Sequence, residues 1–161
     1  MYKLLLIMMM MAVWMAVHLM GVEEELAMKT LSQSKRAINR AAHAAAQQLD
    51  KEALGNGELR IDPQTAAETA MNYLGGNLLV DGEGVPLNTS ILREPIEVLV
   101  FDIVNGDQTF PYVYRNDEHQ FEAVLRKPGV VLIVKVVYPR AFRVLEPIEW
   151  EIRGAAELVA G

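Results

Sequence analysis

Three patterns of apolar and polar positions follow one another along this chain. Residues 4–22 are apolar except for His18 and Gly21. Residues 26–54 contain neither Pro nor Gly and repeat small or apolar side chains every three or four positions. From residue 95 onward, apolar and polar positions alternate over several short segments. This order predicts a membrane-length helix, a helical continuation and then a β-rich part.

The first segment has the length and the flanks of a membrane span. As a helix, residues 4–22 would be about 28 Å long, which is close to the thickness of a bilayer's hydrocarbon core. Lys3 precedes the span and three glutamates follow it, so we expect the N-terminus in the cytoplasm and the rest outside. The alternative is a cleavable secretory signal, but no A-x-A pattern stands near the end of the span. We therefore expect a retained helix, in which His18 is tolerated rather than functional.

The second segment predicts one continuous helix from Leu26 to Leu54, with Gly21 as its soft point and the glycines at 55 and 57 ending it. Spacings of three and four residues place small or apolar side chains along one seam: Ala27, Leu31, Ser34, Ile38, Ala41, Ala45 and Leu49. Small residues let helix backbones approach closely, so the seam fits another copy of the chain. The other interpretation is that the seam packs on the chain's own sheet.

A helix of about 50 residues would be roughly 75 Å long, too long for a domain of about 100 residues to cover. We therefore predict an assembly interface made of Leu4, Leu5, Ile7, Met8, Met11, Val13, Trp14, Val17, Ala27, Leu31, Ile38, Ala41, Ala45 and Leu49. Candidates for charge pairing between copies are Glu23, Glu24, Glu25, Lys29, Lys35 and Arg36. In the simpler interpretation, the glutamates form a solvated rim at the edge of the bilayer.

The remaining residues predict a second, extracytoplasmic domain, so that we divide the chain into 1–54 and 55–161. Asp62 and Pro63 begin a short helix that Gly75 should end. Residues 105–107, Asn-Gly-Asp, predict a hairpin turn, and residues 130–138 predict a central strand buried on both faces. We expect an α+β fold in which an antiparallel sheet of five or six strands packs on the helices.

Charge and composition exclude several functions. The chain has 15 Lys and Arg against 21 Asp and Glu, a net charge of −6, which disfavours nucleic acid as a partner. It has no cysteine, and its three histidines are far apart in sequence. Carboxylates at 81 and 83, or around residues 102–107, could offer oxygens to calcium, but turn chemistry explains them better. We predict no enzyme activity, no cofactor and no metal.

The apolar span at 4–22, continued directly by the Ala- and Arg-rich stretch KRAINRAAHAAAQQLD at 35–50 and then by a β-rich part, resembles the pilin and pseudopilin type of subunit. It is most similar to the TadE/TadG-like proteins of tight-adherence pilus systems. The resemblance implies a filament subunit that is membrane-anchored before envelope machinery assembles it, and that then joins copies of itself at the cell surface. The alternative is a monomeric, membrane-anchored binding or accessory protein of an envelope or secretion machine.

Overall fold

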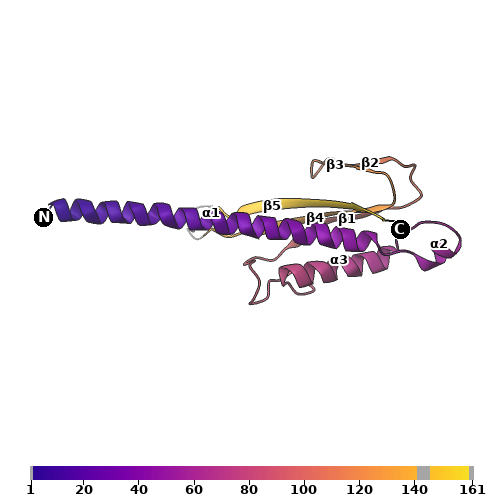
Figure 1. The fold of residues 1–161 in the computed structure, drawn as a ribbon, viewed down its shortest axis with the longest axis horizontal. Coiled ribbons are helices and arrows are strands. Elements are labelled where there is room, and N and C mark those ends of the chain that lie inside the picture. The colour runs from indigo at the N-terminus through magenta and orange to yellow at the C-terminus, as the bar shows by residue number, and fades with distance from the viewer. Residues whose placement is uncertain (1, 141–145, 160–161) are drawn as a thin grey trace.

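The computed structural model describes residues 2–140 and 146–159, and it has the α+β fold that the sequence predicts. A long N-terminal helix projects from a small domain (Figure 1). The elements in chain order are α1 (Tyr2–Ala46), α2 (Lys51–Gly55), α3 (Pro63–Leu78), β1 (Glu97–Val104), β2 (Tyr112–Asn116), β3 (Phe121–Leu125), β4 (Gly129–Tyr138) and β5 (Ile148–Glu157).

The domain has three layers. A three-stranded antiparallel sheet, in the order β1-β4-β5, lies between the helices α1 and α3 on one face and the β2–β3 hairpin on the other (Figure 1). Leu132 and Val134 of β4 pack toward the helices, whereas Val131 and Ile133 pack toward the hairpin. Strand β4 is therefore central and buried on both faces, as its unbroken apolar run predicts.

Strand pairing differs from the prediction in one respect. The five strands form sheets of three and two strands rather than one sheet, because β1 pairs with β4 and not with the strand that follows it. The predicted hairpin at residues 105–107 is therefore wrong. The Asn105 side chain instead binds the backbone of Ile61, accepting from its N–H at 2.8 Å and donating to its carbonyl at 3.1 Å. The sequence also suggests a short strand at 58–61, but there only Ile61 pairs, in an isolated antiparallel bridge with Leu49.

Helix α1 ends at Ala46, so the prediction of one helix to Leu54 is wrong. Beyond the end of the helix, the Gln47 side chain reaches the end of the sheet. Its amide N–H donates to the Glu157 carbonyl, and its amide oxygen accepts from the Val159 N–H. Asp50 then caps the separate helix α2 by accepting from the N–H groups of residues 52 and 53. Residues 47–62, which we call the strap, thus turn the chain back toward β1.

Helix α3 begins as predicted and ends later than predicted. Asp62 is its N-cap and Pro63 its first residue. The helix passes through Gly75 and ends at Leu78, because Leu74 and Leu78 are both buried in the core on the same face. Gly75 serves the helix end differently: its carbonyl accepts from Val80 N–H, and a Cβ there would lie 3.2 Å from the Val80 carbonyl oxygen.

Candidate membrane and assembly surface

We call residues 2–22, the first half of α1, the bare half, because none of their side chains is buried. Every residue from 2 to 22 is exposed, and Trp14 in its middle exposes 64% of its surface. Its most apolar stretch has a mean hydropathy of 2.2 and no buried residue. Among the described residues, this is the one helix long and apolar enough to cross a membrane. A folded domain does not leave such a surface in water, so the surface needs lipid or protein around it.

The predicted assembly interface falls into two parts. The side chains at Leu4, Leu5, Ile7, Met8, Met11, Val13, Trp14 and Val17 are all exposed on the bare half of α1. Of the seam, Ala27, Ile38, Ala41 and Ala45 are buried within this chain, and Leu31 packs against the same core. Leu49 lies beyond the end of α1 and is half-buried in the strap. The seam is therefore covered by the chain itself, which corrects its assignment to contacts between copies.

We call residues 27–46 of α1 the packed half, because small side chains let one face of it pack closely against the sheet and α3. Ala41 and Ala42 pack in one cluster with Leu74 of α3 and Leu132 of β4, and Ala45 and Ala46 pack in a second cluster with Ala70 of α3 and Val130 of β4. On the sheet side, Gly154 of β5 lies so close to α1 that a Cβ there would be 3.3 Å from Ile38 Cγ2. Alanines at adjacent positions, in pairs four residues apart, cover a broad face of the helix. That breadth was the available signal that α1 contacts two elements of its own domain.

Charged residues surround the junction between the two halves. Glu24 and Glu25 are exposed and Glu23 is half-buried, directly after the apolar segment. Lys29, Lys35 and Arg36 are exposed on the packed half. The six side chains are spread over about four helical turns beyond the span, so that the glutamates lie nearest the headgroups and Lys35 and Arg36 lie farthest from them. Pairing of these charges between copies stays a prediction.

His18 packs against Trp14 one turn away, with ring centroids 4.2 Å apart in an edge-on arrangement. The contact is within one helix and fits the interpretation of a tolerated residue. Across the described residues, no group of three His, Asp or Glu side chains is placed to hold a metal ion.

The carboxylates considered for calcium hold the fold together. Asp81 accepts from the N–H groups of Glu83 and Val85, both at 2.9 Å, and so closes its own loop. Asp102 accepts a hydrogen bond from the Tyr114 hydroxyl. Burial and, secondarily, this carboxylate raise the pKa of Tyr114 above its ordinary value. Asp81 therefore makes the turn contacts that the sequence favoured, whereas Asp102 instead binds a tyrosine of β2.

A groove of about 940 Å³ opens beside the outer edge of β1. One wall is the strap at residues 58–60, and the other includes Phe101, Asp102 and Asn105. The Asp102 carboxylate and the Asn105 amide are held by Tyr114 and Ile61, so these two polar groups of the wall are committed to the fold.

No family model, curated protein or solved structure matches this chain. The case for a role of α1 therefore rests on its exposure, length and composition.

Proposed function

We propose that this chain is a pilin-like structural subunit, anchored in a membrane by residues 4–22 and able to join copies of itself through the same residues. In a filament, the bare halves of α1 would form an apolar core and the domains would face water. The observation that carries the proposal is the complete exposure of this half beside a domain that fills its own core.

The bare half exposes many large apolar side chains. The exposed ones between positions 4 and 22 are Leu4, Leu5, Leu6, Ile7, Met8, Met9, Met10, Met11, Val13, Trp14, Met15, Val17, Leu19, Met20 and Val22. At about 1.5–3 kcal/mol for each side chain removed from water, shielding this set is worth tens of kcal/mol. That exceeds the net stability of a typical domain, about 5–15 kcal/mol. The molecule therefore requires lipid or other apolar helices around this segment.

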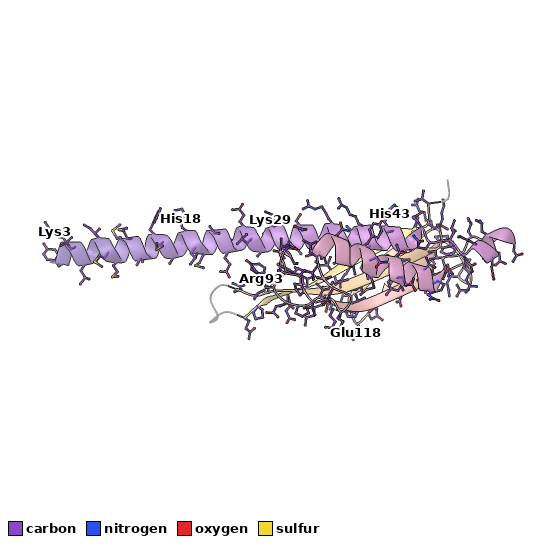
Figure 2. All side chains as sticks on the ribbon, turned by 90° about the horizontal axis from the view of Figure 1, so that it is seen from below. Lys3, His18, Lys29, His43, Arg93 and Glu118 are labelled. Atoms are coloured by element: carbon purple, nitrogen blue, oxygen red, sulfur yellow. The ribbon has the colours of Figure 1, made fainter. Side chains whose placement is uncertain are left out.

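The arrangement of the two halves supports assembly through the first. The packed half joins α1 to the domain along one side, and the bare half extends past the described part of the domain (Figures 1 and 2). Copies that bundle through their bare halves would keep every domain on the outside.

A monomeric anchored accessory protein is the second candidate. Burial of the seam within the chain favours this candidate, because the seam is then not available for contact with another copy.

Cross-linking between engineered cysteines separates these two functions, because the chain has no cysteine of its own. Met8 and Val17 are both exposed on the bare half, and a Met8→Cys/Val17→Cys variant can link each copy to more than one neighbour. The variant is produced in its natural cells, oxidised, and separated into membranes and sheared surface material. A filament subunit gives a ladder of disulfide-linked oligomers in the sheared material.

Two matched variants control this experiment. In Ala41→Cys/Ala45→Cys, both cysteines replace fully buried side chains, so we expect no ladder. In Leu54→Cys, the cysteine is exposed at the distal end of the domain and reports random collision. If the Met8/Val17 variant gives no more cross-linked product than Leu54→Cys, the chain does not assemble through the bare half. The anchored monomer is then the better account.

A further inference from the structure

The end of the sheet nearest the apolar segment lies against α1 where that segment stops. Tyr138, the last residue of β4, has its hydroxyl 3.5 Å from the Glu23 carbonyl oxygen, to which it donates. Glu23 follows directly after the apolar residues 4–22. The domain is therefore held at the level of the last turn of the span rather than standing away from it.

Two apolar side chains beyond the glutamates are also left bare. Leu26 is 50% exposed and Met28 is 60% exposed, although Ala27 between them is buried. We call Leu26, Met28 and Tyr138 the collar. Residues 23–28 rise about 9 Å along the helix. The headgroup layer on one side of a bilayer is about 5–8 Å thick, so the collar spans the depth of that layer.

Aromatic and charged groups around the collar match the chemistry of headgroups. Tyr138 stacks at a tilt on Trp150, with ring centroids 6.2 Å apart, and tyrosine and tryptophan are enriched where membrane meets water. Lys29 and Arg93 are both exposed and lie at this end of the domain (Figure 2). Glu24 and Glu25 stand nearby, and this mixture of both signs fits zwitterionic headgroups better than an anionic surface.

We infer that, while the chain is anchored, the collar is immersed in the headgroup layer of the bilayer, so that the domain rests on the lipid surface. This inference rests on the proposed anchoring by residues 4–22. It adds a second lipid-binding surface, on the domain itself, and it fixes which end of the sheet faces the membrane.

Depth-dependent fluorescence quenching tests the inference, because the chain has only two tryptophans, Trp14 and Trp150. The full chain is reconstituted into phosphatidylcholine vesicles that contain either lipids brominated deep in the acyl chains or lipids with a headgroup spin label. Three variants each hold one tryptophan. Trp150→Phe keeps Trp14, and Tyr138→Trp and Leu54→Trp are each made in a Trp14→Phe/Trp150→Phe background.

We expect Trp14 to lose most intensity with the deep bromines, and the tryptophan introduced at position 138 to lose most with the headgroup label. The tryptophan at position 54 is part of α2, which lies at the far end of the domain (Figure 1), and it should lose none with either. If positions 138 and 54 behave alike while Trp14 is quenched, the inference is wrong and the anchoring stands. If Trp14 is quenched by neither lipid, the anchoring itself fails.

A second variant covers the case in which Tyr138→Trp does not fold, as judged by circular dichroism. Trp14→Phe keeps the native Trp150, whose ring lies 6.2 Å from that of Tyr138. Its fluorescence should be quenched by the headgroup label more than that of the position-54 control. Equal quenching would overturn the inference.

Discussion

The two halves of α1 form one unbroken helix and meet opposite surroundings. Up to Val22 the helix carries large side chains, and all of them are exposed. From Ala27 to Ala46 its inward face carries mostly alanine and is fully covered by the chain itself. The difference lies in side-chain size more than in hydrophobicity. Small residues mark the half that fits closely against the rest of the chain, and large residues mark the half that the chain leaves exposed.

Glutamate at matched alanines gives the largest expected effect and separates the halves most sharply. Ala41→Glu places an unpaired carboxylate in the core and should lower the free energy of unfolding by roughly 3–5 kcal/mol. Ala12→Glu lies on the exposed half and should leave that free energy unchanged, while making membrane insertion less favourable by about 3 kcal/mol. Urea unfolding in detergent and vesicle flotation measure the two effects. Equal loss of stability in both variants would contradict the division of α1.

Removing the hydrogen bonds between the Asn105 side chain and Ile61 of the strap should have the next largest effect on stability. In Asn105→Ala, the buried Ile61 loses side-chain partners for both its N–H and its carbonyl, so we expect a loss of about 2–3 kcal/mol. Asn88→Ala, at an exposed loop position, is the control. Urea midpoints that do not differ between the two variants would show that the strap is held by other contacts.

Adding a methyl group at the contact between α1 and β5 should destabilise the domain less than the loss of the Asn105 hydrogen bonds does. A Cβ at Gly154 would lie 3.2 Å from Asn39 Oδ1 and 3.3 Å from Ile38 Cγ2, so Gly154→Ala should destabilise the domain by about 1–2 kcal/mol. Gly21→Ala places its methyl group in open space on the bare half and should not destabilise the domain. Thermal unfolding of both variants checks this. An unaffected Gly154→Ala would mean that the packed half is looser than its distances indicate.

The smallest effect concerns Asp62, which caps the helix that covers the packed half. Hydrogen bonds from Thr65, through its side chain first and its backbone second, lower the pKa of Asp62 from 3.8. A lowered folded-state pKa means that this cap stabilises the domain above pH 3.8 and that the stabilisation fades as pH falls through the folded value. Asp62→Asn keeps an acceptor that does not titrate, so its urea midpoint should fall less on acidification. Identical pH profiles would exclude this role.

Much of this architecture could be predicted from sequence because its signals are local. The apolar run at 4–22, the cap at Asp62 and the unbroken apolar strand at 130–138 each depend on neighbours a few residues away, and the structure confirms all three elements.

The wrong predictions concern residues whose contacts are with residues far away in the sequence. Asn105 does begin a turn, in which Gln108 N–H donates to its carbonyl, but β1 does not pair with the strand that follows, and the Asn105 side chain binds Ile61, 44 positions away. Alanine spacing along the seam is the same whether the partner is another copy or the chain's own sheet, so spacing alone could not choose. Leu26 and Met28 were missed as surface residues because the glutamates before them suggested that the apolar surface had ended.

The most direct test of the account is the intact mass and N-terminal sequence of the native protein, recovered from its own cells and fractionated into membranes, sheared filaments and soluble material. The account predicts that residues 4–22 are retained and that the protein occurs with membranes or filaments. A freely dissolved protein that begins near Glu23 would contradict it.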